Sequence, residues 1–260
     1  MKVHVHGDDP LHYGKVKMKC DHRLDTDALR FPKCLQSLQS GFNVMINGAS
    51  GSGKTNLLIQ LLKCPHDRQL GIRKSLKKIF DTVIIVSPSL KTLQDNIFKG
   101  LKHKFETFDE DTLTEIDEIL TRNEHSEESD DEDEIKKTLL ILDDCGSMLK
   151  GGVKEKLFDH LVKNRRHRHL SIICITQKFR DASTTYRGNL THFITFKPRN
   201  EIEATSIYDE MIGHERKYMH AILDSIFRKR FDHLLIDFTQ HHGQGFLYYS
   251  NFRPISFEKK

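Results

Sequence analysis

The first segment of the chain that can do chemistry is glycine-rich. It reads Gly48-Ala49-Ser50-Gly51-Ser52-Gly53-Lys54-Thr55. This matches the phosphate-binding pattern G-x-x-x-x-G-K-[ST] at every fixed position. Glycines let the backbone curl so that its N–H groups converge on phosphate oxygens, and a helix that begins there adds its positive end. We therefore expect all eight residues to bind the phosphates of a nucleoside triphosphate. Lys54 would reach the β- and γ-phosphates, and the Thr55 hydroxyl would coordinate Mg²⁺.

A second segment ends an apolar run with two carboxylates. It reads Leu139-Leu140-Ile141-Leu142-Asp143-Asp144. A continuous apolar run indicates a strand buried on both faces, which would place both acids at its carboxyl end beside the phosphates. We expect Asp143 to hold Mg²⁺ through water. Asp144 would orient or deprotonate the attacking water, unless it caps the helix that follows.

These two motifs leave more than one class of nucleotide enzyme open. Residues 143–146 also fit the D-x-x-G pattern of GTPases. However, Arg180 follows a later strand where guanine recognition needs a carboxylate, so guanine specificity is disfavoured. A small-molecule phosphotransferase such as a nucleoside kinase remains the alternative, although we find no arginine-rich lid.

The segments that must position these motifs alternate between strands and helices. Strands are predicted at residues 42–47, 82–87, 138–142, 171–176 and 192–196, and helices at 55–63 and 153–162. Such alternation favours a mostly parallel sheet covered by helices. A final pair of strands, 234–238 and 246–250, is predicted to form a β-hairpin. The segment at 82–87, between the two nucleotide motifs, suggests an extra sheet position between them, as in motor ATPases.

The domain organisation is simple. The 260 residues are enough for one α/β domain at 42–260, preceded by an N-terminal extension at 1–41. Within that extension, alternation from Val16 to Cys20 predicts a strand, and Pro32 and Gly41 bracket a short helix. The run 124–134 holds eight acids and no bases, which indicates a solvated loop inserted in the domain.

Composition limits where the protein can act and what it can bind. No apolar run approaches the roughly 20 residues of a membrane span, and five cysteines without paired spacing suggest reduced thiols. We expect an intracellular protein with no membrane partner. Without the acidic run, 41 basic residues face 29 acidic ones, a balance that suits a polyanion.

The stretch from Thr138 to Phe196 resembles the poxvirus-type DNA-packaging ATPases of the FtsK/HerA superfamily, which have relatives in large DNA viruses, virophages and Polinton transposons. Four features carry the resemblance in order. They are the acidic pair followed by Cys145-Gly146, Arg166-His167 with Ser171 before a strand that ends in Gln177, Phe179-Arg180, and Arg187 with Asn189 leading into Thr191-His192-Phe193. With the phosphate-binding segment, the likeness covers about residues 42–197.

This resemblance implies a RecA-like P-loop NTPase fold and an ATP-driven motor that packages a viral or virus-like genome. Members act as homo-oligomeric rings, commonly hexamers, on double-stranded DNA and with a capsid or portal protein. The resemblance thus implies a location in the cytoplasm or nucleus of an infected cell, or in association with the virion. Gln177 would be the polar sensor of the γ-phosphate. Arg166 and Arg187 both match arginine positions, and either would act as the finger on the neighbouring subunit's ATP.

The cluster of basic residues at 163–169 leaves several interpretations open. It would line a DNA channel, supply the finger, or solvate a helix end. Arg165 stands where the family often has glycine, and this extra cation would either crowd the finger or strengthen its contact with phosphate. The Arg228-Lys229-Arg230 run is a second, weaker candidate for DNA contact. A third function, nucleotide-gated assembly with negligible turnover, also stays open.

Overall fold

The computed structural model describes residues 2–5, 35, 41–63, 76–91, 96–125, 136–146, 149–239 and 247–258. These residues form a ten-stranded sheet in the order β1-β10-β9-β8-β7-β2-β6-β5-β3-β4. The strand predicted from Val16 to Cys20 and the helix predicted before Gly41 lie outside the described residues, apart from the single residue Leu35. Among the described residues, no helix combines the length and the apolar composition that crossing a membrane requires.

One half of the sheet is parallel and carries both nucleotide motifs. Its strands are β2 (Asn43–Asn47), β3 (Thr82–Val86), β4 (His103–Phe105), β5 (Thr138–Asp143), β6 (Leu170–Thr176) and β7 (His192–Phe196). All five residues of β2 and all six of β5 are buried, as expected for parallel strands covered on both faces. The α/β fold class predicted from the sequence is thereby confirmed.

The other half of the sheet is antiparallel. Its strands are β8 (His233–Asp237), β9 (Tyr248–Ser250), β10 (Arg253–Glu258) and β1 (Lys2–Val5). β8 and β9 form the predicted hairpin, with Leu235 opposite Tyr249. β1 pairs with β10, so the first residues of the chain belong to the same sheet. The expected boundary at residue 41 does not separate them from it.

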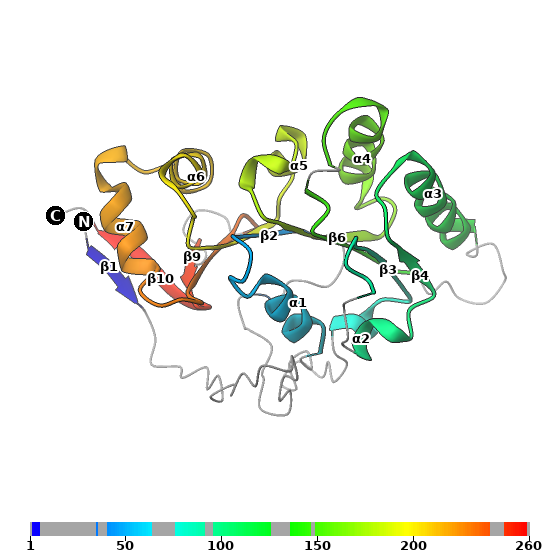
Figure 1. The fold of residues 1–260 in the computed structure, drawn as a ribbon, viewed down its shortest axis with the longest axis horizontal. Helices are drawn as coiled ribbons and strands as arrows, with labels where there is room; N and C mark the ends of the chain where they lie inside the picture. Colours follow the sequence, from blue (N-terminus) through cyan, green and yellow to red (C-terminus); the bar gives the residue numbers. More distant parts are fainter. Residues whose placement is uncertain are drawn as a thin grey trace.

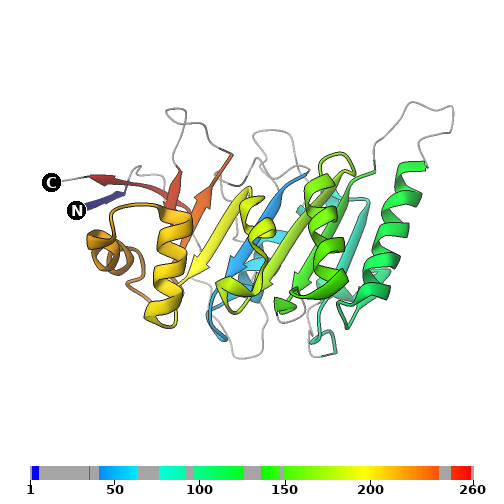
Figure 2. The same ribbon diagram turned by 90° about the horizontal axis from the view of Figure 1, so that it is seen from above.

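Two layers of helices cover the sheet (Figures 1 and 2). One layer contains α3 (Glu110–His125), α4 (Gly152–Asn164), α5 (Thr184–Gly188), α6 (Glu201–Ile207) and α7 (Met219–Ile226). A π-helical turn, Tyr208–Ile212, continues α6, and 3-10 turns lie at Phe179–Asp181 and Arg216–Tyr218. The opposite layer contains α1 (Lys54–Lys63), the 3-10 turn Leu76–Ile79 and α2 (Asn96–Lys99).

The alternation of side chains along each strand produces two cores. Met45 packs with the α3–α7 layer, whereas Val44 and Ile46 pack with the α1 layer. β5 divides in the same way, with Leu140 on the first face and Leu139 on the second. Successive strand residues point to opposite faces, so the apolar runs serve both layers. This burial fixes the strands, and their carboxyl ends then carry the site.

Two expectations about the sheet and its insertion need correction. An extra strand does lie between β2 and β5, but it is β6, whereas the segment suggested from the sequence, β3, lies beyond β5. The acidic run 124–134 is not loop throughout, because α3 extends to His125. Glu124 belongs to this helix, where it accepts a hydrogen bond from Arg168 Nε at 2.7 Å. Residues 126–134 of the run lie outside the described part of the chain.

Candidate nucleotide-binding site

The site is built where three parallel strands end side by side. β2 lies between β6 and β7, and the register places Asn47 beside Thr176 and Thr195. The backbone N–H of Gly48 donates to the Thr176 carbonyl at 3.2 Å, which continues the ladder by one residue into the phosphate-binding loop. The loop after β2 therefore lies at the same edge of the sheet as the residues that follow β5 and β6.

The glycines of this loop are required by geometry at two positions. Gly53 has a φ of +103°, which side-chain-bearing residues rarely adopt. Gly48 is confined by packing, since a Cβ there would lie 2.9 Å from Phe196 Cβ. Helix α1 begins at Lys54, directly after the loop, and so directs its N-terminal N–H groups at the same place.

Lys54 is largely buried beneath the loop. Its Nζ donates to the carbonyl oxygens of Gly48 at 2.7 Å and Ala49 at 2.9 Å. Burial lowers the pKa of Lys54, while the negative charges of Asp144, Asp143 and Glu203 act in the opposite direction. The ammonium group is therefore held in place by groups that a phosphate can replace.

Asp143 is a buried carboxylate at the end of β5. Its side chain accepts a hydrogen bond from the Ser87 hydroxyl at 3.3 Å. Burial, and next the charge of Asp144, raise the pKa of Asp143 to about 6, although Ser87 and Lys54 oppose the change. A buried acid with so little compensation favours a cation beside it.

Asp144 and Gln177 face one another across the ends of β5 and β6. Gln177 Nε2 lies 2.7 Å from each carboxylate oxygen of Asp144, to which it donates. Both side chains are exposed, and Asp144 has a φ of +58°, a left-handed conformation that non-glycine residues seldom adopt. Four residues predicted from the sequence, Lys54, Asp143, Asp144 and Gln177, thus share one edge.

Glu203 also belongs to this edge, and sequence reasoning missed it. It lies in the first turn of α6, and its Oε1 accepts hydrogen bonds from Asn47 Nδ2 at 3.3 Å and from the backbone N–H of Phe179 at 3.1 Å. Asn47 in turn accepts from the Thr176 hydroxyl at 3.0 Å. Glu203 therefore ties the strand before the phosphate-binding loop to the segment after Gln177. No motif could have indicated it.

The two arginines expected to act on a neighbour's nucleotide differ in their surroundings. Arg166 is exposed beside Gly41, just before β2 and β6, and so lies at the opposite edge from the phosphate-binding loop of its own chain. Arg187 is almost buried. Its guanidinium donates to Glu210 Oε1 at 2.6 Å and to the Ala182 carbonyl, and it lies 4.8 Å from the centre of the Phe179 ring.

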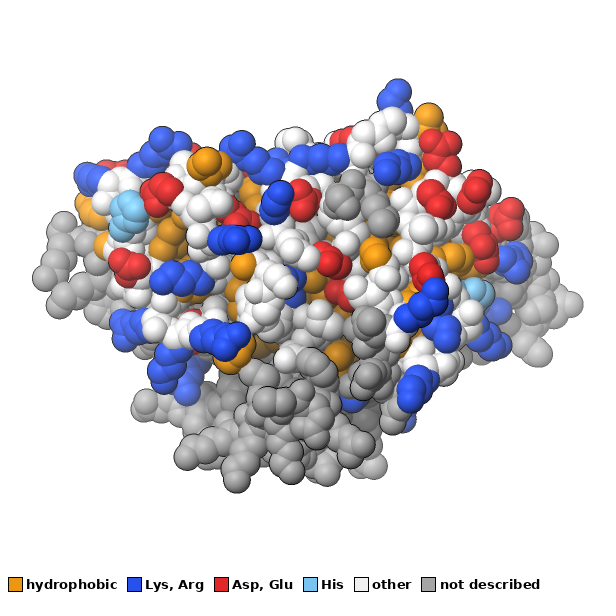
Figure 3. All heavy atoms as spheres, in the orientation of Figure 1, with side chains coloured by type: hydrophobic (Ala, Val, Ile, Leu, Met, Phe, Trp, Pro, Cys, Tyr) orange, Lys and Arg blue, Asp and Glu red, His pale blue; other side chains and the backbone are white. Residues whose placement is uncertain are grey.

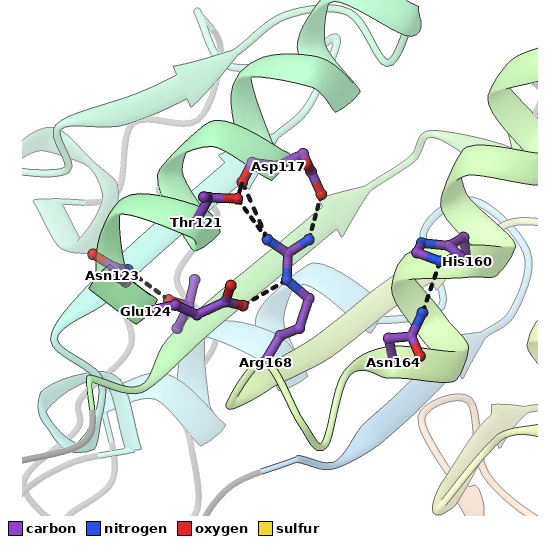
Figure 4. A network of polar contacts seen from close by, with 8 residues as sticks. Asp117, Thr121, Asn123, Glu124, His160, Asn164 and Arg168 are labelled. Atoms are coloured by element: carbon purple, nitrogen blue, oxygen red, sulfur yellow. Dashed lines mark hydrogen bonds and ion pairs between the residues drawn. The ribbon is translucent and has the colours of Figure 1, made fainter. Parts of the chain in front are cut away.

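The basic cluster at 163–169 is partly engaged within the fold (Figure 4). Arg168 binds Asp117, Thr121 and Glu124 of α3, which joins that helix to the loop before β6. Arg165 is buried and donates to the carbonyls of Val162 at 2.9 Å and Gly41 at 3.2 Å, so it closes the end of α4. Arg165, which stands in the family's glycine position, therefore binds α4 through one carbonyl and the segment before β2 through the other.

A loop that can wrap phosphates lies between β2 and α1, and an acidic pair lies at the end of a strand two positions away in the sheet. Together these two features define a P-loop NTPase. The family model described as "Poxvirus A32 protein" matches residues 31–236, and the chain belongs to that family. This confirms the resemblance to poxvirus-type packaging ATPases that the sequence indicated. No curated protein matches the chain by sequence.

Solved structures share the fold at low sequence identity. The DNA-packaging ATPase B204 from Sulfolobus turreted icosahedral virus is 15% identical with a TM-score of 0.54, over 82% of this chain and 98% of that one. The genome-packaging NTPase B204 of Sulfolobus turreted icosahedral virus 2, in complex with AMPPCP, is 16% identical with a TM-score of 0.55, over 80% and 96%. The pCW3 conjugation coupling protein TcpA is 12% identical with a TM-score of 0.51, over 76% and 58%. Neither the family nor these structures support the phosphotransferase alternative.

Proposed function

We propose that this protein is the ATP hydrolase of a viral genome-packaging motor, which moves double-stranded DNA into a capsid. The observation that carries the proposal is the convergence of Lys54, Asp143, Asp144 and Gln177 at one edge of the sheet. Membership of the poxvirus A32 family supports the packaging role. Such a motor works inside the infected cell, at a capsid or portal protein.

Lys54 and the loop around it bind the triphosphate. Phosphate oxygens replace the Gly48 and Ala49 carbonyls as partners of the Lys54 ammonium group, and backbone N–H groups of the loop donate to the remaining oxygens. The lysine gains negative partners in this exchange. Its charge is then directed at the β- and γ-phosphates, where negative charge redistributes during hydrolysis.

Asp144 and Gln177 act on the water that attacks the γ-phosphorus. The Asp144 carboxylate orients this water and accepts its proton, and Gln177 holds the carboxylate through its amide N–H groups. We expect the same amide to exchange Asp144 for a γ-phosphate oxygen when ATP is bound. Gln177 would in this way report whether the γ-phosphate is still present.

Asp143 and Thr55 fit a magnesium ion. Both offer oxygen ligands of the kind Mg²⁺ prefers, and a cation beside the buried Asp143 carboxylate would offset the burial that raises its pKa. When bound, the ion would supply positive charge that neutralises the β- and γ-phosphate oxygens. Ser87 keeps the Asp143 carboxylate oriented toward this position.

Exposed cations gather at the edge that carries the phosphate-binding loop, and these support DNA as the partner. They follow β6, follow β7 and precede β8: Lys178, Arg180, Lys197, Arg199, Arg228, Lys229 and Arg230. Figure 3 shows Lys and Arg side chains spread over the half of the molecule with α6 and α7, and acids gathered over α3. Contacts from such side chains to the DNA backbone would be independent of sequence, as translocation requires.

A homo-oligomeric ring, with a hexamer as the expected size, would place an arginine of one subunit at the ATP of the next. Arg166 is the better candidate of the two, because it is exposed and lies at the edge away from its own loop. Arg187 is held by Glu210 and Ala182, so its release would break contacts within the subunit.

The test is ATP hydrolysis with and without linear double-stranded DNA across a salt series. Wild-type rings should show stimulation that fades as salt rises, and Lys54→Ala should abolish hydrolysis at every salt. Arg180→Glu together with Arg199→Glu should remove the stimulation and keep the basal rate. Hydrolysis by assembled rings that is indifferent to DNA would contradict the motor, and phosphorylation of a small acceptor would favour a kinase.

A further inference from the structure

One aromatic ring is exposed beside the phosphate-binding loop. Phe231 lies in the connection between α7 and β8, and it is 40% exposed. Its Cδ1 would lie 3.4 Å from a Cβ added to Gly53, so the ring lies directly against the loop. Phe196 lies against the same glycine but is 3% exposed. Phe231 is therefore the ring of this pair that solvent, or a ligand, reaches.

The order of the strands decides which end of the nucleotide faces Phe231. Asp144 and Gln177, which the proposed function assigns to the γ-phosphate end of the nucleotide, follow β5 and β6, on one side of β2. β7 and β8 lie on the other side of β2. A triphosphate that crosses the loop with its γ-phosphate toward Asp144 must direct its nucleoside toward β7 and β8. Phe231 lies just before the first residue of β8, at the edge of the sheet where β7 ends.

Two hydrogen bonds to the Asp232 carboxylate hold the turn that contains Phe231. The backbone N–H of Lys229 donates to Asp232 Oδ2 at 2.7 Å, and Asn251 Nδ2 donates to Asp232 Oδ1 at 2.9 Å. The guanidinium of Arg230 lies over the Phe231 ring, 5.2 Å from its centre. The Arg228-Lys229-Arg230 run therefore leads into a turn that is fixed against the β9–β10 connection.

We propose that Phe231 is the surface on which the purine base of ATP stacks in this chain. The inference rests on the nucleotide site of the proposed function, which it deepens by assigning the subsite for the base. A ring face binds any purine, because stacking does not read the hydrogen-bonding edge. The site should accordingly bind ATP and GTP with similar affinity. This agrees with Arg180 standing after β6 at the position where guanine recognition needs a carboxylate.

The chain has no tryptophan, so a single substitution creates a specific reporter. Phe231→Trp should give fluorescence that ATP quenches and that inorganic tripolyphosphate, which has no base, leaves unchanged. Phe231→Ala should weaken ATP binding by about 5- to 150-fold, the range that stacking energies of about 1–3 kcal/mol correspond to, without weakening tripolyphosphate binding. Phe238→Ala is the matched control, because Phe238 is 39% exposed and follows β8 at the opposite edge.

The outcomes separate this inference from the proposed function. Unchanged ATP affinity in Phe231→Ala, or an equal loss for ATP and tripolyphosphate, would overturn the stacking role, the second result marking Phe231 as a support of the loop. If wild-type protein binds neither ligand, the nucleotide site fails and the inference with it. If wild type binds both but DNA never stimulates hydrolysis by assembled rings, the motor fails and the stacking role stands.

Discussion

Replacing Asp143 separates two effects of this residue: the destabilisation of the fold by its buried charge, and its part in binding Mg²⁺ and ATP. Its carboxylate is buried, with Ser87 as its hydrogen-bond donor, and burial raises its pKa to about 6. Above that pH the folded protein carries a buried charge that the unfolded chain would expose to water. Asp143→Asn keeps the shape and removes the charge. We therefore expect this variant to be more stable than wild type at pH 8 in the absence of nucleotide.

The magnitude follows from the pKa difference. Burial raises the pKa of Asp143 from its ordinary value of 3.8 to about 6. At about 1.4 kcal/mol per pKa unit, the ionised carboxylate therefore lowers the free energy of unfolding by about 3 kcal/mol. The folded state holds its proton more tightly, so wild type recovers stability as the pH falls. At pH 5 about half of the difference should remain, and near pH 4 most of it should be gone.

Urea denaturation of wild type and Asp143→Asn at pH 8, 6 and 5, without nucleotide or Mg²⁺, measures this directly. Asp144→Asn is the matched control, because Asp144 is exposed and should change stability much less. Asp143→Asn should also lose most of the stabilisation that Mg²⁺ and ATP together give wild type. A stability difference that is absent at pH 8, or the same at pH 8 and pH 5, would refute the reasoning.

Three further substitutions test other parts of the structure. Gly48→Ala should abolish ATP binding and destabilise the fold by about 1–3 kcal/mol, because its Cβ would lie 2.9 Å from Phe196 Cβ; equilibrium binding and urea melts would show both. Arg168→Ala should cost about 1–2 kcal/mol, since Asp117 and Glu124 lose their partner; in the same urea assay, exposed Lys163→Ala should be neutral. Gln177→Glu should lower kcat by about 10²-fold or more, because a carboxylate would replace the amide that donates to Asp144. Steady-state kinetics would contradict this if KM alone rose.

The strands that carry the site could be predicted from the sequence because their apolar runs are continuous. β2, β5, β6 and β7 each lie within one or two residues of the expected range. Helix α3 was missed although Leu113, Ile116 and Leu120 follow helical spacing, because its acidic residues run into the acidic segment. The three-residue edge strand β4 has two polar residues and no alternation that a sequence could display.

The site residues that depend on sheet order could not be found in the same way. Asp143 and Gln177 each end a recognisable strand, so the meeting of their strands could be expected. Glu203 reaches the site only because β7, which precedes its helix, lies next to β2. Phe231 reaches the loop because β8 pairs antiparallel with β7 and therefore begins at the same edge. Both contacts depend on neighbours in space that are far apart along the chain.

The densest run of basic residues in the sequence does not mark the place where exposed cations meet in the folded protein. The run 163–169 is the densest basic cluster in the sequence, yet Arg165 and Arg168 direct their donors into the fold. A cluster that ends a helix faces carbonyls and neighbouring acids, and these compete with any outside partner. The exposed cations after β6, after β7 and before β8 come from separate segments and meet only through the strand order. Cations that approach one another from separate loops in this way repel, and a bound polyanion relieves that repulsion. The surface for the DNA backbone is accordingly better sought at the edge of the phosphate-binding loop than in the run 163–169.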